Sequence, residues 1–386
     1  MIKILQYLLN YYDIIRFRIK AGEMNVKRDR KSKGKRLKIL LFIALAVAII
    51  LIGKDNKLGA FSFVNQFLTT EKSMKIKYFI EDENILDVKV YDENIAKWKN
   101  NKLSFLRSNG NIIVEKEFNF SDPGIFYGNR YIYVFDRDTG NIYILDKKGE
   151  TVNRLHLDKQ IFNIKESGNN LLYHIKAEGS EIVGVLDKDG VLIGNYTYEN
   201  ENILTYASST DGELNALGLL DISDGSIGSK IDIYGEVNKK IKSIFIEGEL
   251  ILHIGFTSNN ELIALTDRNL YFTKDGSIMW KKQYDLIKDI YVGEERIYIL
   301  YSNYLEIMDY GGRVESKISF GQDYNKISIL KDRLVLNGSS QLVVMDKDKQ
   351  ILKHSEAIIK AFQGKNSIVL WTPEGIKVYD IVNKTE

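Results

Sequence analysis

A strand pattern that returns about every 40 residues constrains this chain most. From Lys102 onward a short apolar strand is repeatedly followed by a turn rich in Asp and Gly, as in NIYILDKKGE and QLVVMDKDKQ. The residues that close these strands lie 39, 41, 47, 39, 36, 37 and 34 positions apart. A period near 40 built from strands is typical of one four-stranded propeller blade. These eight closing residues are Arg107, Asp146, Asp187, Tyr234, Thr273, Asp309, Asp346 and Asp380.

The two ends of the repeat predict how the ring closes. Two further strand candidates precede each closing residue, for example KISIL and RLVLN before QLVVM. The last repeat lacks an outer strand, whereas residues 74–82 have a strand pattern with no partner of their own. Pairing these two segments removes both loose edges. We therefore predict an all-β propeller over residues 74–386, with eight four-stranded blades. Seven blades is the alternative, because residues 190–234 are irregular.

A block of apolar residues near the N-terminus predicts where the propeller resides. Residues 39–53 carry no charge and, with residues 37–38, reach about 25 Å as a helix, close to the lower limit for a bilayer. No small-residue cleavage site follows it. We predict a basic segment over 1–36, an uncleaved transmembrane helix over 37–53 and a linker over 54–73. A cleaved signal peptide or a buried core helix are the alternatives.

Charge predicts the orientation of this anchor. Residues 27–38 contain eight Lys and Arg residues, whereas only Lys54 and Lys57 flank the other side. Cations mark the cytoplasmic side of a membrane helix, so we expect a cytoplasmic N-terminus and a propeller outside the cytoplasm, at the cell membrane. Residues 1–20 have near-helical apolar spacing, which predicts an amphipathic helix on the inner leaflet or against a partner helix. Alternatively, translation starts at Met24.

The sequence offers no catalytic constellation. It contains no cysteine, which excludes disulfides and thiolate chemistry, and its four histidines are at least 18 residues apart. Nucleophile-elbow, phosphate-loop and dinucleotide-binding patterns are absent. Residues 135–141 (FDRDTGN) and 186–190 (LDKDG) resemble the start of a calcium loop but lack its distal acid, which favours turn closure. We predict no catalytic, cofactor-binding or metal-binding residues.

Two local motifs give a resemblance to known propellers. Trp280 follows Gly276 by four residues, as in quinoprotein-type repeats, and ASSTDG (residues 207–212) is similar to a turn of WD-type repeats. The whole chain resembles a family of bacterial membrane-anchored propeller proteins catalogued as a domain of unknown function. The resemblance implies a fold and brings no catalytic residues with it. A quinone-dependent dehydrogenase is the enzymatic alternative, for which only Trp98, Trp280 and Trp371 offer large planar side chains.

Function is therefore expected from surfaces. We expect a non-enzymatic scaffold that binds another protein of the cell envelope, because loops on a rigid β-platform are the usual place for recognition. A receptor for a wall glycan or a small ligand is the alternative. Nucleic acid is not an expected partner, because residues 1–38 hold a net charge of about +9 and leave about −7 for the remainder. No small-molecule substrate or cofactor is evident.

Overall fold

The computed structural model describes residues 72–222, 226–235, 239–330, 333–346 and 349–383. The predicted segments 1–36 and 37–53, and all but the last two residues of the linker 54–73, lie outside the described residues. Among the described residues, no helix has the length and apolar character needed to cross a bilayer.

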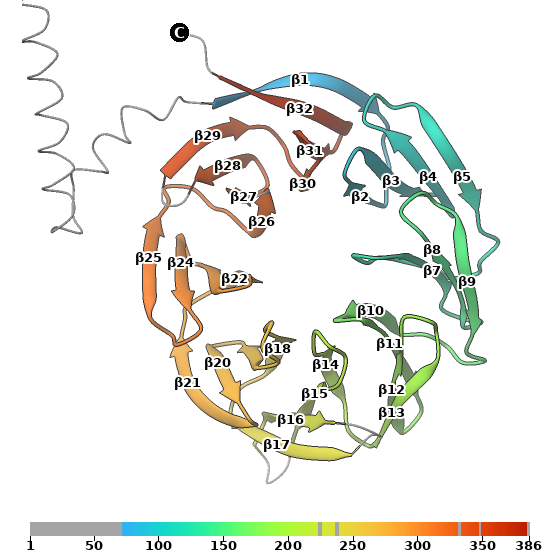
Figure 1. The fold of residues 1–386 in the computed structure, drawn as a ribbon, viewed down its shortest axis with the longest axis vertical. Helices are drawn as coiled ribbons and strands as arrows, with labels where there is room; N and C mark the ends of the chain where they lie inside the picture. Colours follow the sequence, from blue (N-terminus) through green and yellow to red (C-terminus); the bar gives the residue numbers. More distant parts are fainter. Residues whose placement is uncertain (1–71, 223–225, 236–238, 331–332, 347–348, 384–386) are drawn as a thin grey trace, which may run out of the picture. The chain divides into compact units, whose positions relative to one another are not determined.

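Strands account for the architecture. In the described ranges, 32 strands form eight four-stranded antiparallel sheets, and these sheets are arranged as the blades of a ring (Figure 1). The predicted eight-bladed all-β propeller is confirmed. The seven-blade alternative is wrong, because the irregular stretch before Tyr234 holds regular strands of blades 3 and 4.

Within a blade the strands run in chain order from the axis outward. The strands of blades 1 to 4 are β2 (Asp87–Tyr91), β3 (Asn94–Lys99), β4 (Lys102–Arg107), β5 (Ile112–Glu117), β6 (Pro123–Tyr127), β7 (Ile132–Asp136), β8 (Asn141–Leu145), β9 (Thr151–His156), β10 (Asn163–Ser167), β11 (Asn170–Ala177), β12 (Ser180–Leu186), β13 (Leu192–Glu199), β14 (Ile203–Ser208), β15 (Asn215–Asp221), β16 (Gly228–Tyr234) and β17 (Lys240–Glu247).

Blades 5 to 7 repeat this order, and blade 8 draws its outermost strand from the start of the described chain. Their strands are β18 (Ile251–Phe256), β19 (Leu262–Thr266), β20 (Asn269–Lys274), β21 (Ser277–Gln283), β22 (Ile287–Val292), β23 (Arg296–Tyr301), β24 (Tyr304–Asp309), β25 (Val314–Ser319), β26 (Lys326–Leu330), β27 (Arg333–Asn337), β28 (Gln341–Asp346), β29 (Lys349–Ser355), β30 (Lys360–Gln363), β31 (Ser367–Thr372), β32 (Gly375–Asn383) and β1 (Lys72–Glu81).

The ring is closed by β1. This strand pairs antiparallel with β32, from Lys72 opposite Asn383 to Glu81 opposite Gly375, and becomes the outer strand of blade 8. The predicted closure by an N-terminal strand is confirmed, with the strand starting two residues before Met74. In Figure 1, β1 and β32 lie side by side along the outer edge of the ring. Both ends of the eight-blade repeat are thereby paired.

The two faces of the ring differ in the turns they carry. The proximal face is defined here by the turns that join the first to the second strand, and the third to the fourth strand, of each blade. Ser367, which follows such a turn, pairs with Asp380, so β32 ends on this face. Lys72 pairs with Asn383, so β1 starts there as well. The chain therefore enters and leaves the propeller on its proximal face.

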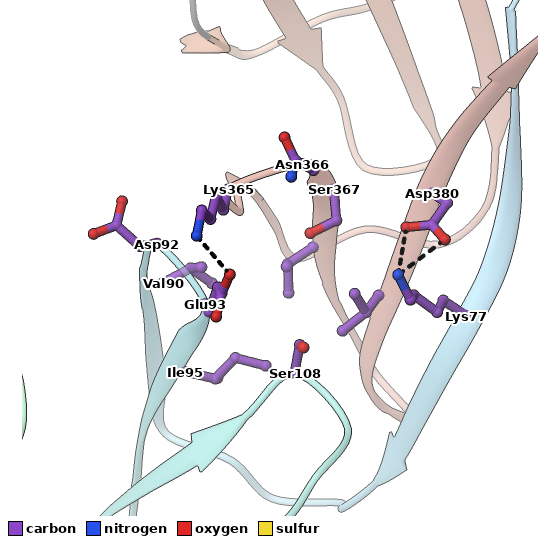
Figure 2. Close-up of a pocket in the computed structure, with 12 residues that line it drawn as sticks. Lys77, Val90, Asp92, Glu93, Ile95, Ser108, Lys365, Asn366, Ser367 and Asp380 are labelled. Carbon is purple, nitrogen blue, oxygen red and sulfur yellow. Dashed lines mark hydrogen bonds and ion pairs between the residues drawn. The ribbon is translucent and has the colours of Figure 1, made fainter.

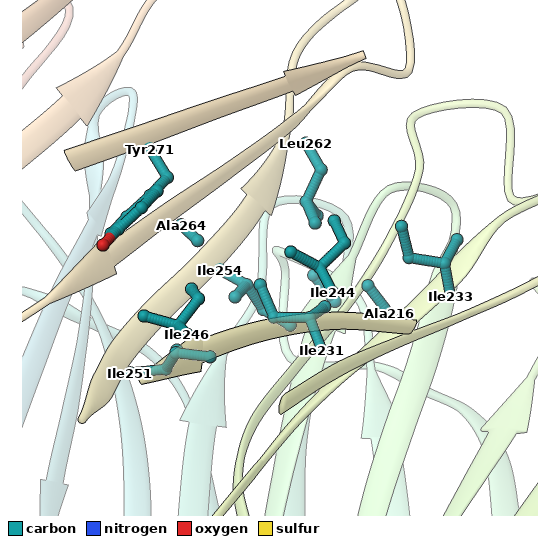
Figure 3. Close-up of a cluster of buried hydrophobic side chains, with 11 residues drawn as sticks. Ala216, Ile231, Ile233, Ile244, Ile246, Ile251, Ile254, Leu262, Ala264 and Tyr271 are labelled. Carbon is teal, nitrogen blue, oxygen red and sulfur yellow. The ribbon is translucent and has the colours of Figure 1, made fainter. Parts of the chain in front are cut away.

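The hydrophobic core is divided among the blade junctions. Within the described residues, eight clusters of buried apolar side chains each join two adjacent blades, including blades 8 and 1. Figure 3 shows the cluster between blades 4 and 5, where Ile231 and Ile246 lie near Ile251 and Ile254. Because the middle strands are covered on both sides, β7 is buried along its whole length. This explains why its sequence, IYVFD, does not alternate between apolar and polar residues over its first four positions.

The acidic turns close hairpins, as predicted. In the turn between β8 and β9, an Asp146 side-chain oxygen accepts hydrogen bonds from the backbone N–H of Lys148 at 2.8 Å and of Glu150 at 2.9 Å. Gly149 has a φ of +89°, and a Cβ there would lie 2.5 Å from the Phe105 ring of blade 1. Glycine is required at this position both for the turn and for the packing of blade 2 on blade 1.

Trp280 joins blades 5 and 6. Its ring stacks on Phe272 with centroids 5.5 Å apart and planes 5° apart, and its Nε1 donates to the carbonyl oxygen of Tyr310 at 2.9 Å. Gly312 of the same blade 6 turn faces the indole. Trp280 therefore packs blade 5 against blade 6.

Replacing Trp280 measures how much its side chain contributes to the stability of the fold. We expect Trp280→Ala to lower the free energy of unfolding by about 2–3 kcal/mol, through lost packing and one unpaired carbonyl. Chemical denaturation followed by circular dichroism measures the change. Met279→Ala is the matched control, because the adjacent Met279 is exposed. Equal midpoints for the two variants would contradict the assigned role.

Candidate functional site on the proximal face

The histidines, which are candidates for catalysis or metal binding, are dispersed around the ring. His156, His174, His253 and His354 lie in blades 2, 3, 5 and 7. His174 is buried and 3.0 Å from a Glu181 oxygen, and His354 is 3.1 Å from Glu356. Burial lowers the pKa of His253 to about 4. In the part of the chain that the structure describes, no three His, Asp or Glu side chains are grouped to hold a metal ion.

The two calcium-like segments are turns. Asp136 is buried, and its carboxylate accepts hydrogen bonds from the Thr139 hydroxyl at 2.9 Å and the Asp122 backbone N–H at 3.1 Å. Burial raises its pKa, but these and further hydrogen bonds outweigh that effect and leave the pKa below its ordinary value. Asp187 accepts from the backbone N–H of Asp189 and of Val191. Turn closure thus accounts for the carboxylates that head both segments.

Buried acids elsewhere tie strands together. Asp232 in blade 4 accepts from Tyr198 at 2.9 Å, and Glu249, in the connection between blades 4 and 5, accepts from Tyr271 at 2.9 Å. In blade 6, Glu306 accepts from Tyr284 at 2.6 Å. Burial raises the pKa of each of these tyrosines, and the neighbouring carboxylates raise it further. The three acids bind three different tyrosines, so they form separate structural contacts.

The tryptophans do not surround the axis. Trp98 lies on β3, Trp280 on β21 and Trp371 on β31. Each of these is a second or an outermost strand, whereas the innermost strands line the axis. The ASSTDG motif of residues 207–212 ends β14 and forms the turn to β15 on the proximal face. The two motifs that carry the resemblance therefore belong to a contact between blades and to a turn.

Hydrogen bonds tie the proximal turns of neighbouring blades into a rim. The Tyr91 hydroxyl of blade 1 donates to the Gly128 carbonyl of blade 2 at 2.9 Å. The backbone N–H of Lys365 in blade 8 donates to the Asp92 carbonyl at 2.9 Å, which closes the rim between the last and first blades. Such contacts hold these loops on a rigid platform, the arrangement that favours recognition.

A cavity opens at the axis inside this rim. We call it the axial cavity; it has a volume of about 580 Å³ and lies between β2, β26 and β30, with Asn129 and Lys147 from blade 2 on its edge. Its size falls within the range of ligand pockets. Its wall combines apolar residues such as Val90 and Phe362 with three lysines, Lys89, Lys147 and Lys365.

Lys89 is the least exposed of these three lysines. Burial lowers the pKa of Lys89, and the nearby cations Lys360 and Lys147 lower it further, whereas Asp87 partly opposes them. Lys147 extends over the Tyr91 ring, with its ammonium nitrogen 5.6 Å from the ring centroid. Among the described residues, no carboxylate lies within ion-pair distance of Lys89 or Lys147. Lys89 and Lys147 therefore line the cavity without a direct counter-charge, whereas Lys365 is paired with Glu93.

A smaller pocket lies beside the axial cavity, between blades 8 and 1 (Figure 2). Its volume is about 130 Å³, below the usual range for ligand sites. Figure 2 shows four of its five charged side chains in two pairs: Lys365 with Glu93 at 3.0 Å and Lys77 with Asp380 at 3.1 Å. Since these charges are already paired, the pocket belongs to the closure of the ring.

An apolar arc runs along the outer wall near the proximal face. In blades 1 to 5 the outermost strand has a bulge near its start, one residue after its first paired residue in blades 1 to 4 and two residues after it in blade 5. Each bulge residue is aliphatic or Met and 44–59% exposed. In blade 6 the same position holds Glu315. Bulges protect sheet edges, but this protection does not require an exposed apolar side chain at each bulge. The apolar arc consists of Ile113, Val152, Ile193, Ile241 and Met279.

Sequence reasoning missed both features. A signal for the apolar arc was present, since aliphatic residues directly follow the turns in NGNIIV and DGVLIG. The axial cavity had none, because Lys89 and Lys365 are far apart in the chain and meet only after the ring closes.

Comparison with known proteins now places the chain. Residues 65–381 match a family described as a family of unknown function, DUF5711. The chain belongs to this family. We find no curated protein with a matching sequence.

Solved structures share the fold of this DUF5711 propeller. It is similar to BamB from Moraxella catarrhalis, with 10% identity, a TM-score of 0.52, and 80% of this chain and 99% of that one covered. Sqt1 from Saccharomyces cerevisiae gives 9% identity and a TM-score of 0.58 over 81% of this chain and 100% of its own. The C-terminal WD40 domain of Sif2 gives 13% identity and a TM-score of 0.59 over 82% of this chain and 99% of its own. At such identities the likeness concerns the fold alone.

Proposed function

We propose that this protein is a non-enzymatic scaffold, anchored in the cell membrane by residues 37–53, whose propeller binds another envelope protein outside the cytoplasm. The observation that carries the scaffold function is the apolar arc. Five successive blades present an exposed apolar side chain at one equivalent position. Exposed apolar side chains repeated at one level of the outer wall make this wall a candidate interaction surface, and a partner that follows the wall would cover the arc. The BamB-like and WD40-like fold is compatible with this function.

Charge and chain direction support the anchored location. Residues 27–38 carry the cations that predict a cytoplasmic N-terminus. The propeller begins at Lys72 on its proximal face, so the apolar arc lies near the side on which the chain enters.

The second candidate function is a receptor for a small ligand that is anionic, or that combines anionic and apolar groups. The axial cavity supports it, because its volume of about 580 Å³ suits a small ligand. In that case the ligand would be held by the axial cavity, and the apolar arc would stay free of protein.

Photo-crosslinking in intact cells tests the scaffold proposal. A photoreactive amino acid is placed at Ile193, at Met279 or at Glu315, the equivalent polar position in blade 6. We expect one recurrent crosslinked protein from the first two positions and none from Glu315, because apolar contact drives the interaction. Mass spectrometry identifies the partner.

Location is measured in the same cells. Protease added outside the membrane is expected to digest the propeller but not residues 1–36. A propeller that stays protected would contradict the orientation. A correctly placed protein that yields no crosslinked partner from either apolar position would contradict the scaffold.

A further inference from the structure

We propose that the axial cavity binds an extended acidic peptide segment of the partner protein. This inference rests on the proposed scaffold function and names the chemistry of one contact. It is carried by the cations, the innermost strands and the apolar walls that meet at the proximal end of the axis.

The cations come from three blades. Lys89 lies on the innermost strand of blade 1, Lys147 on a proximal turn of blade 2, and Lys365 on the proximal turn of blade 8. Of the residues that line the cavity in the described structure, Asp92 is the only carboxylate. Lys365 is paired with Glu93, whereas the other two ammonium groups have no carboxylate within reach. Carboxylates entering the cavity would supply the missing counter-charges.

Strand edges favour an extended peptide over a small anion. The innermost strands β2 and β30 each pair on one side only, with β3 and β31. Their inward edges offer backbone N–H and C=O groups of the kind that hold an added strand. The cavity wall contains consecutive residues 89–92 and 361–365 of these two blades, so both edges reach it.

Apolar residues give the same wall a second specificity. Val90, Ile329, Ala361 and Phe362 line the cavity together with the lysines. An inorganic anion would leave these walls uncovered and much of the 580 Å³ unfilled. A peptide in which acidic and aliphatic residues alternate would place one kind of side chain on the cations and the other on the apolar wall, since successive side chains of an extended strand point in opposite directions.

Titration of the full-length chain in detergent tests the inference. The probe is a fluorescently labelled hexapeptide of alternating leucine and glutamate, followed by anisotropy at low salt. We expect binding that Lys89→Gln weakens at least about tenfold, because a charged hydrogen-bond donor is lost. Lys89→Arg should retain binding. Lys147→Gln should weaken binding, whereas Lys148→Gln, on the exposed neighbour in the same turn, should not change it.

Three results of the peptide titration would overturn the inference. These are no binding of the peptide, equal binding of a peptide of alternating leucine and lysine, or affinities that Lys89→Gln and Lys147→Gln leave unchanged. Inorganic phosphate could also compete with the peptide, with the same lysine substitutions weakening its binding. That result would assign the site to small anions and overturn the peptide inference. If crosslinking from the apolar arc succeeds while the peptide fails, the scaffold stands and only this inference falls.

Discussion

A chain that begins at Asp82, and therefore lacks β1, is expected to lose the closed ring. Without β1 the outer edge of β32 is unpaired along its length, from Gly375 to Asn383. Two cores also lose a side chain, because Met74 packs against the core between blades 7 and 8, and Ile80 against the core between blades 8 and 1. We expect insolubility or a fall in melting temperature of at least about 10 °C, since several kcal/mol of packing and pairing are lost.

The matched control is a chain that begins at Lys72. It keeps β1 and is expected to fold as a soluble β-protein, because every blade then has four strands. Thermal melting followed by circular dichroism compares the two chains. A synthetic peptide of residues 72–81 added to the shorter chain should restore part of the difference. If both chains melt at the same temperature, β1 does not close the ring.

The second large effect is expected at Asp232, a fully buried carboxylate in blade 4. It accepts hydrogen bonds from the hydroxyls of Ser243 at 2.5 Å and Tyr198 at 2.9 Å and from the Lys240 ammonium at 3.0 Å. Asp232→Ala would leave these donors without their acceptor. We expect the free energy of unfolding to fall by about 3–5 kcal/mol, the usual cost of breaking a buried charged network.

The pH dependence of stability gives an independent measurement. Burial raises the pKa of Asp232, but the hydrogen bonds from Ser243, Lys240 and Tyr198 outweigh burial and hold the pKa below its ordinary value of 3.8. A carboxyl group with a lowered folded pKa stabilises the protein fully above its unfolded pKa, and this contribution is lost as the pH falls through the folded value. We therefore expect the difference between wild type and Asp232→Asn to shrink below about pH 4.

Asp189→Ala is the control for both measurements, because Asp189 is an exposed turn residue. We expect its unfolding free energy to stay within about 0.5 kcal/mol of wild type. Comparable losses of unfolding free energy in the Asp189 and Asp232 variants would show that the buried network stabilises the protein no more than an exposed turn residue does.

Most of the fold could be predicted because its causes are local. Asp146 and Gly149 specify a turn by their own backbone preferences, and the apolar run of β7 reports burial on both sides. Such signals recur in each blade, so the period and the eight blades follow from them. Even the closure by β1 was predictable, since one unpaired strand at each end has one obvious partner. The anchor over residues 37–53 stays a prediction.

Which side chains meet on the surface was decided by the tertiary structure. Lys89, Lys147 and Lys365 come together because ring closure places blade 8 beside blade 1, and no local pattern encodes that distance. The apolar arc likewise depends on a bulge that turns Ile193 and its equivalents outward, although the same letters would fit a buried strand. Sequence alone determined a propeller, because turns and alternation act over a few residues. Its candidate binding surfaces arise only where distant blades pack together.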